Sequence, residues 1–306
     1  MKWLLEGDPA IRYQTLRDLT DASKEEIENE CKKIERKGWG LSYLEKANSS
    51  GGWALQYYQP KWISTHYTLL ELKNLGIVPG YPIISKGLDQ AFALPVGLDG
   101  GLNIGVTIQY SDVCVNGMIL NFASYFQCNE KNLISIVDFL LKTQMYDGGW
   151  NCRYCREGAK HSSLHTTICV LEGLHEFLKN SYTYEKKRII KVMSDAHEFM
   201  MLHRLYKSDH TGEIINKKMT MLSYPSRWRY DVLRAMDYLR DAGVKYDARM
   251  DDTVKLILSK RRSDGTWPVQ AKHAGKVHFD MEKTGGPSRW NTLRVLRILK
   301  YYDINA

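Results

Sequence analysis

A repeated unit of about fifty residues constrains this sequence more than any other feature. Four glycine-rich turns recur along the chain, and an apolar segment of helical length follows each of them. The turns are SSGGW (49–53), DGGL (99–102), DGGW (147–150) and DGTW (264–267). Glycine suits the end of a helix because the chain commonly adopts a left-handed conformation there. Self-similarity at this period is typical of proteins built from repeated helical hairpins.

Six copies of the apolar segment can be aligned. A fifth copy at 226–239 follows a degenerate turn around Gly212, and 12–19 resembles 289–296 and supplies the sixth. The alignment places one side chain of each copy at an equivalent position: Tyr13, His66, Cys114, His165, Trp228 and Trp290. Amphipathic segments lie between the copies, and there is little of the alternation typical of strands. Each repeat therefore predicts two helices and two connections.

The two ends of the chain predict how these hairpins are arranged. An open array of repeats needs polar caps, but the first and last copies resemble each other and both carry apolar faces. Packing the first helix against the last would bury both faces. The sequence therefore predicts an all-α (α/α)6 toroid that forms a single domain over 1–306, with six parallel inner helices and six or fewer outer helices.

Composition narrows the class of protein. The chain has 43 Lys and Arg against 35 Asp and Glu, but the basic residues are spread out, which favours solvated helix faces over a nucleic-acid surface. No apolar run approaches the roughly 20 residues of a membrane span. The short apolar patch before Glu6 is not a signal peptide. We therefore expect a cytoplasmic protein whose six cysteines are not paired as disulfides.

The DGGW turn belongs to a longer string, Gln144-x-x-x-Gly148-x-Trp150. This string resembles the QW motif of squalene and oxidosqualene cyclases, in which the three residues tie outer helices to the turns. Together with the repeat, it makes nearly the full chain similar to the terpenoid cyclase and protein prenyltransferase superfamily, including bacterial prenyltransferase and squalene oxidase repeat proteins. The DxDD acid motif of class II cyclases has its nearest counterpart in DARMDDT (247–253), where Arg249 replaces the first Asp. A cyclase that starts its reaction by protonating squalene is therefore disfavoured.

The resemblance to protein prenyltransferases implies a zinc site. Their β subunits bind zinc through an Asp-x-Cys pair and a later His, which correspond here to Asp112, Cys114 and His165. The repeat alignment independently places Cys114 and His165 on adjacent inner helices, and a thiolate and an imidazole are preferred Zn²⁺ ligands. The stretch 103–111 contains no Lys or Arg, whereas those enzymes hold a diphosphate with basic residues there.

Other roles for these residues stay open. Asp112 aligns with serines that cap helices, Cys114 could be a small buried side chain, and His165 a hydrogen-bonded structural residue. A second possible zinc site lies nearby in the sequence, and its ligands would be Cys152, Cys155, His161 and His165.

The opposite side of the predicted ring is aromatic and basic. Tyr13, Trp228 and Trp290 occupy equivalent positions, and an arginine precedes each of them. An aromatic wall beside Arg227 and Arg289 would suit an apolar chain with an anionic head, such as an isoprenoid diphosphate. Packing between helices and pairing of the arginines with Asp280 or Glu282 would explain the same residues without a ligand.

These observations favour a zinc-dependent transferase or lyase acting on an isoprenoid-like or other apolar substrate in the central cavity. His66 and Glu172 are the candidates for a catalytic role. One alternative is a non-catalytic toroid that binds a lipid or a peptide. Another is a carbohydrate-active (α/α)6 enzyme, which needs paired carboxylates, but the predicted helix starts supply only Asp112, with Glu172 two turns below His165. No surface for a partner subunit can be identified from the sequence.

Overall fold

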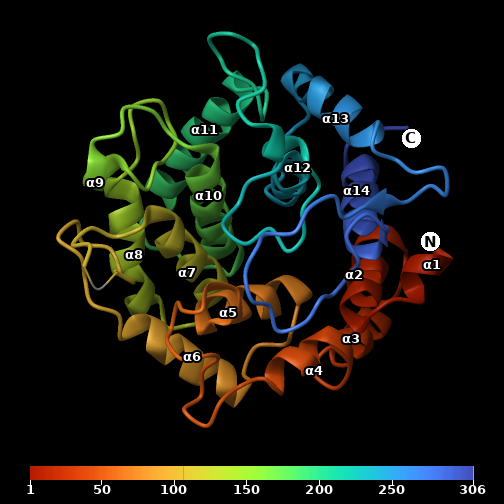
Figure 1. Ribbon diagram of the computed structural model, residues 1–306, viewed down its shortest axis with the longest axis horizontal. Coiled ribbons are helices and arrows are strands. Elements are labelled where there is room, and N and C mark those ends of the chain that lie inside the picture. Colours follow the sequence, from red (N-terminus) through yellow and green to blue (C-terminus); the bar gives the residue numbers. More distant parts are fainter. Residues whose placement is uncertain (106, 306) are drawn as a thin grey trace.

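The computed structural model describes residues 1–105 and 107–305, and its helices form a closed ring (Figure 1). The inner helices are α2 (Pro9–Leu19), α5 (Thr65–Leu75), α7 (Val113–Tyr125), α10 (Leu164–Lys179), α12 (Val232–Asp241) and α14 (Arg289–Tyr301). The outer helices are α3 (Lys24–Cys31), α4 (Gly38–Leu44), α6 (Pro82–Phe92), α8 (Glu130–Lys142), α11 (Lys186–Leu202) and α13 (Asp251–Leu258). The predicted all-α toroid is therefore confirmed.

Short elements complete the ring. They are the helices α1 (Lys2–Leu5) and α9 (Tyr154–Glu157), the 3₁₀ helices η1 (Lys61–Ile63), η2 (Lys217–Thr220) and η3 (Ala248–Met250), and the strands β1 (Trp267–Pro268) and β2 (Pro287–Ser288). The strands pair antiparallel, with Trp267 opposite Ser288. No helix in the described part of the chain is long and apolar enough to cross a membrane.

The ring closes where the last helix meets the first. Helix α14 packs against α2 and α1. Arg297 donates a hydrogen bond of 2.9 Å to the Gln14 side chain, and Arg289 donates one of 2.9 Å to the carbonyl of Trp3. The apolar faces of both ends are thereby buried, which is why the chain needs no polar caps.

Three of the glycine-rich turns have the same construction, and each centres on a fully buried tryptophan: Trp53, Trp150 and Trp267. In each turn the indole N–H donates to the carbonyl ten residues earlier, at 2.7 or 2.8 Å. The backbone N–H of each tryptophan donates to a threonine hydroxyl of the next inner helix: Thr65, Thr167 and Thr292. These bonds fix the angle between each outer helix and the inner helix that follows.

The glutamine of the QW-like string adds a further tie. The Gln144 amide donates to the carbonyls of Gly148, at 2.8 Å, and Val192, at 2.9 Å, and so joins the turn to the neighbouring outer helix α11. This is the role that the sequence resemblance implies. Gly148 has φ of +92°, and a Cβ there would lie 2.6 Å from the carbonyl oxygen of Asp195, so only glycine fits.

Relative to the tryptophan turn before it, α5 begins three residues later than α10 and α14 do. Thr65 is the first residue of α5, whereas Thr167 and Thr292 are the fourth residues of their helices. The η1 turn stands in place of the missing helical turn, and His66 is therefore three residues out of register with His165 and Trp290. Helix α12 was expected to begin near 226 but begins at Val232, because the carboxylate of Asp231 caps it by accepting a 2.9 Å hydrogen bond from the backbone of Arg234.

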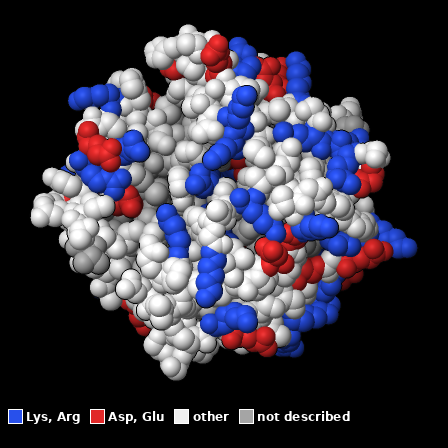
Figure 2. Space-filling model, in the orientation of Figure 1, with Lys and Arg blue, Asp and Glu red and all other residues white. Residues whose placement is uncertain are grey.

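Two long connections close one half of the hole. The segments before α12 and between β1 and β2 cross the middle of the ring in Figure 1. They are bonded to each other, since the backbone N–H of Gln270 donates to the carbonyl of Leu222 at 2.9 Å. On the face shown in Figure 2, Lys and Arg side chains are distributed over many elements rather than gathered into one patch.

Candidate active site in the lumen

The remaining hole is a cavity of about 450 Å³, which lies within the usual range for ligand pockets. All six inner helices line it, and α5, α7, α10 and α12 do so largely with residues of their second halves. Tyr224, Ser226 and Arg227 close it from the segment before α12. The second halves of these four neighbouring helices can share one cavity only if the four helices run in the same direction. The sequence analysis looked for a site at the helix starts, but the large cavity lies toward their C-terminal ends.

The wall of this cavity is charged and predominantly basic. Its basic side chains are Arg17, Lys73, Lys179, Arg227, Arg234, Arg240, Arg294 and Arg297. Its acidic side chains are Glu172, Glu176, Asp237 and Asp241. Helix C-termini carry a partial negative charge, so cations are favoured near the ends of these six parallel helices. The wall of the lumen carries twice as many cationic as anionic side chains.

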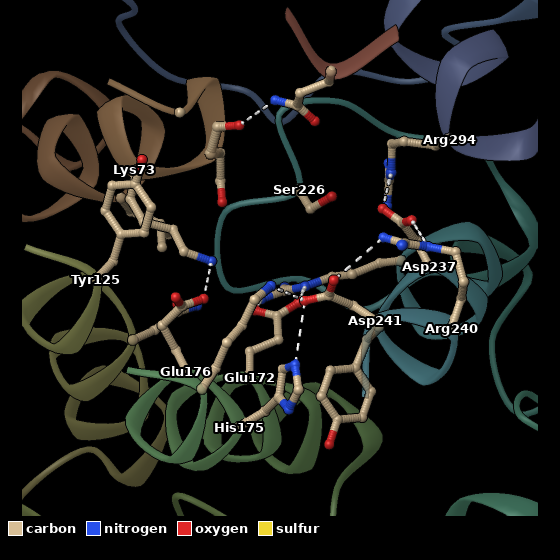
Figure 3. A pocket seen from close by; sticks show the side chains of 18 of the residues that line it. Lys73, Tyr125, Glu172, His175, Glu176, Ser226, Asp237, Arg240, Asp241 and Arg294 are labelled. Atoms are coloured by element: carbon tan, nitrogen blue, oxygen red, sulfur yellow. Dashed lines mark hydrogen bonds and ion pairs between the residues drawn. The ribbon is translucent and has the colours of Figure 1, made fainter. Parts of the chain in front are cut away.

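Helix α10 presents a polar stripe to the lumen. Glu172, His175, Glu176 and Lys179 are three or four residues apart and therefore lie on one face of the helix. Glu176 forms an ion pair with Lys73 of α5, and Lys73 Nζ lies 3.0 Å from Glu176 Oε2 (Figure 3). Burial would raise the pKa of the Glu176 carboxyl, but Lys73 and Lys179 more than offset this and hold the pKa below its usual value. Glu176 is thus kept ionised.

A histidine and an aspartate form a second pair on the same wall. His175 Nε2 lies 3.2 Å from Asp241 Oδ2, and Lys179 donates to the same oxygen at 2.8 Å (Figure 3). Burial alone would raise the pKa of Asp241, but the bond from His175 and the charge of Lys179 hold it well below its usual value. An ionised carboxylate therefore orients the imidazole. The ring of Tyr238 packs edge-on against His175 with centroids 6.0 Å apart.

Asp237 is shared by three arginines. Arg297 donates to it at 2.6 Å, and Arg294 and Arg240 each donate at 3.3 Å. Burial would raise the pKa of Asp237, but the arginines, chiefly Arg297, outweigh that effect and lower it. One carboxylate cannot neutralise three guanidinium groups, although Arg297 also pairs with Asp18 at 3.0 Å. This part of the wall therefore retains positive charge.

The floor of the lumen contains polar atoms without partners. Arg227 is 5% exposed, and its nearest carboxylate, Glu71, is 3.6 Å away. Arg227 Nη1, Glu71 Oε1 and Asn121 Oδ1 are all buried and have no hydrogen-bond partner among the described residues. Burial raises the pKa of Glu71, which Arg227 only partly opposes. Arg227 and Asn121 line the cavity, so a bound ligand would supply bonds to their side chains, whereas Glu71 is fully buried behind them.

The structure brings four of the residues singled out from the sequence to this cavity. Tyr13, Glu172, Arg227 and Trp290 line it, and Arg234 donates to both carboxylate oxygens of Glu172, at 2.8 and 2.7 Å.

Three others lie elsewhere. The Arg289 guanidinium lies over the Trp3 ring, 4.5 Å from its centroid. Trp228 lies in the loop before α12, where its ring packs edge-on with the His165 ring. His66 is fully buried among aromatic rings, where Tyr57 bonds its Nδ1 at 3.1 Å and burial lowers its pKa to about 3. The missing first turn of α5 is the reason that His66 faces the core.

The predicted zinc ligands have different neighbours from one another. Asp112 faces Arg156 at 3.5 Å, Cys114 lies against Cys152, and His165 Nδ1 accepts a 2.8 Å hydrogen bond from the backbone of Tyr230. Of the alternative set, Cys155 is on α9 and His161 is exposed. Over residues 1–105 and 107–305, no three His, Cys, Asp or Glu side chains are grouped so that they could hold a metal ion.

Most of the lumen residues were missed by the sequence analysis. They include Lys73, His175, Asp237, Asp241 and Arg294. One feature of the sequence could have indicated these residues, namely the spacing of charged side chains within segments that otherwise predict buried helices. Charged or histidine side chains three or four residues apart in 172–179, 234–241 and 294–297 interrupt apolar faces, and such interruptions indicate a polar interior surface.

Comparison with known proteins supports the fold and leaves the chemistry open. No family model matches the sequence, and no curated protein matches it. Among solved structures, a glycosyl hydrolase of family 88 from Bacteroides vulgatus matches with a TM-score of 0.54 and 10% identity, over 99% of this chain and 95% of that one. A polysaccharide lyase matches with a TM-score of 0.50 and 13% identity, over 97% and 89%.

A type II terpene cyclase from Scytonema also matches, with a TM-score of 0.48 and 12% identity, over 97% of this chain and 87% of that one. Identities this low show a shared fold only. The chain is thus an (α/α)6 toroid similar in fold to enzymes of different chemistry, and the lining of its own lumen has to distinguish between them.

Proposed function

We propose that the lumen is the active site of an enzyme that cleaves an acidic carbohydrate by removing a proton next to its carboxylate. The observation that carries this proposal is the basic, charged wall of the cavity. An isoprenoid chain placed there would be surrounded by ionised side chains, which an apolar ligand cannot solvate. A sugar acid offers hydroxyls and a carboxylate to the same groups, and guanidinium groups bind carboxylates in a bidentate manner.

His175 is the proposed proton acceptor. Its hydrogen bond to the ionised Asp241 fixes the orientation of the imidazole and stabilises the cation that forms when it takes a proton. The arginines of the wall would neutralise the substrate carboxylate, which makes the adjacent C–H more acidic. As the proton leaves, its electron pair forms a carbon–carbon double bond and the glycosidic oxygen departs from the next carbon.

Tyr238 is the proposed donor of a proton to the departing oxygen. It lines the cavity beside His175, and burial raises its pKa well above the usual value, so the phenol stays protonated. Its hydroxyl lies 2.9 Å from His197 Nε2 of the outer helix α11, so it has to turn from that partner to reach the substrate.

The carboxylates of the wall favour elimination over hydrolysis. Hydrolysis of a glycoside needs one carboxylic acid that is protonated at the working pH. Burial raises the pKa of Glu71, but this side chain has no exposed surface and is not among the residues that line the cavity. Glu176 is paired with Lys73, which keeps it ionised, and Glu172 is held in the bidentate pair with Arg234. The proposal thus follows the chemistry named for the matching polysaccharide lyase rather than that named for the matching glycosyl hydrolase.

The zinc-dependent transferase predicted from the sequence is not part of this proposal. No group of three possible metal ligands is found among the described residues, and no step above passes through a metal. Zinc binding by Asp112, Cys114 and His165 stays a prediction, which elemental analysis of the purified protein would test. Zinc retained in a Cys114→Ala/His165→Ala variant would exclude that ligand set.

A turnover assay tests the proposal. Acidic polysaccharides are incubated with the enzyme, and the unsaturated product is followed by its ultraviolet absorbance while neutral polysaccharides serve as controls. We expect His175→Gln to lower kcat by about 100-fold or more with little change in KM. The exposed His210→Asn should leave both unchanged. New reducing ends without an increase in ultraviolet absorbance would show hydrolysis and contradict the assignment of His175 as the base.

A further inference from the structure

Two cysteines that the sequence assigned to alternative zinc sites lie side by side in the structure. Cys114 is in the first turn of α7, and Cys152 is in the loop that follows the DGGW turn, 38 residues away in sequence. The backbone N–H of Cys114 donates to Cys152 Sγ at 3.2 Å, which places the Cys152 sulfur against the backbone from which the Cys114 side chain extends. Both residues are partly exposed, so the pair lies near the protein surface.

The two sulfur atoms have different surroundings. Cys152 Sγ also accepts a hydrogen bond from the Thr166 hydroxyl at 3.5 Å, and it lies at the N-terminus of a 13-residue helix. N–H and O–H donors together with the positive end of a helix favour a thiolate and make its sulfur the nucleophilic member of a pair. By contrast, Cys31 and Cys169 each donate to a backbone carbonyl.

We propose that Cys114 and Cys152 form a reversible disulfide. With oxidised glutathione as the oxidant, the Cys152 thiolate attacks one sulfur, the glutathione disulfide breaks, and one glutathione thiolate leaves. Cys114 gives up its proton to solvent and attacks the sulfur of Cys152 in the mixed disulfide, which displaces the second glutathione. The two cysteines lose two electrons and two protons, and the oxidant gains them as two glutathione thiols.

The disulfide would act on a second cavity, of about 420 Å³, at the start of α7. Asp112 and Arg156 pair at 3.5 Å in the wall of this cavity. Asp112 is two residues before Cys114, and Arg156 is four residues after Cys152. A covalent bond between the two cysteines would join the start of α7 to the loop that carries Arg156 and so fix this wall. The inference goes beyond the proposed function and does not depend on the lumen chemistry.

Peptide mapping of the folded full-length protein tests the proposal. The protein is equilibrated with mixtures of reduced and oxidised glutathione, quenched with acid, alkylated and digested. We expect a Cys114–Cys152 cross-linked peptide that disappears on treatment with dithiothreitol. Failure to find it under oxidising conditions that leave the circular dichroism spectrum unchanged would overturn the proposal, as would a Cys152–Cys155 bond in its place.

Single variants assign the roles of the two sulfurs. Cys114→Ser should trap glutathione on Cys152, whereas Cys152→Ser should leave Cys114 largely unmodified. Cys155→Ser, three residues from Cys152 on α9, is the matched control and should leave the cross-link intact. Equal trapping of glutathione on Cys114 in Cys152→Ser would contradict the assignment of Cys152 as the attacking group.

Discussion

Arg227 Nη1 lies 3.6 Å from Glu71 Oε1, and neither buried atom has a hydrogen-bond partner within the described chain. The pair joins the floor of the lumen to α5, yet it is too long for a hydrogen bond. Each side chain therefore depends on the other for charge balance, and Arg227, which lines the cavity, keeps a donor for a ligand. This relationship predicts different results for single and double substitutions.

Removing the charge of Arg227 alone should destabilise the protein much more than removing the charges of Arg227 and Glu71 together. We expect Arg227→Gln to lower the free energy of unfolding by about 3 kcal/mol or more, because it leaves Glu71 buried without a counter-charge. The double variant Glu71→Gln/Arg227→Gln should recover most of that loss. Chemical denaturation of the three proteins measures this, and equal losses in the single and double variants would show that the charges do not interact.

Asp241 should matter for turnover more than for substrate affinity. Asp241→Asn removes the charge that orients His175 and stabilises its cation, so we expect kcat to fall by about 100-fold while KM changes little. Steady-state kinetics on an acidic polysaccharide measures both constants. A rise in KM with an unchanged kcat would instead make Asp241 part of the substrate-binding wall.

The tryptophan of the DGGW turn should contribute to stability through its indole N–H. Trp150→Phe keeps an aromatic ring but removes the bond to the carbonyl of Leu140, and we expect it to cost about 1–3 kcal/mol. Tyr146→Phe is a suitable control, since that side chain is 81% exposed in the same turn and should change stability little. Thermal denaturation of both variants checks the difference, and equal melting temperatures would contradict the role of the bond.

Acidification should destabilise the protein through its buried histidines. Burial lowers the pKa of His66 to about 3, and of His165, His197, His273 and His278 to about 4. The unfolded chain takes up these protons near pH 6.5, before the folded protein does, so stability is complete above about pH 6.5 and falls as the pH approaches 4.

Urea denaturation at pH 7.5 and pH 5 measures that loss. His66→Gln should reduce the pH dependence, and the exposed His210→Asn should not change it. A stability that stays constant between the two pH values would show that the buried histidines do not remain neutral in the folded protein.

The fold could be predicted from the sequence because its strongest constraint is local and repeated. The Trp53, Trp150 and Trp267 turns make the same indole and backbone hydrogen bonds, so similar residues recur in each of these turns. The register within each repeat was less predictable. At α5 a 3₁₀ turn replaces one helical turn, and the serine before each segment gives no sign of that change. His66 was therefore placed in the cavity although it lies in the core.

The candidate site was harder to predict because it depends on contacts between repeats. Glu172 was singled out, but its partner Arg234 belongs to the next inner helix, 62 residues later. Asp237 binds Arg297 across 60 residues in the same way. The sequence shows which charges lie on each helix. Which of these side chains meet in the lumen depends on the relative positions of the helices along the ring axis.

Calorimetric titration with short acidic and neutral oligosaccharides of equal length tests the central claim most directly. The account predicts that the wild-type protein binds the acidic ligand, that added salt weakens this binding, and that the Glu71→Gln/Arg227→Gln variant loses most of it. Equal affinity for the neutral ligand, or binding of an isoprenoid diphosphate in the lumen in place of the acidic sugar, would contradict it.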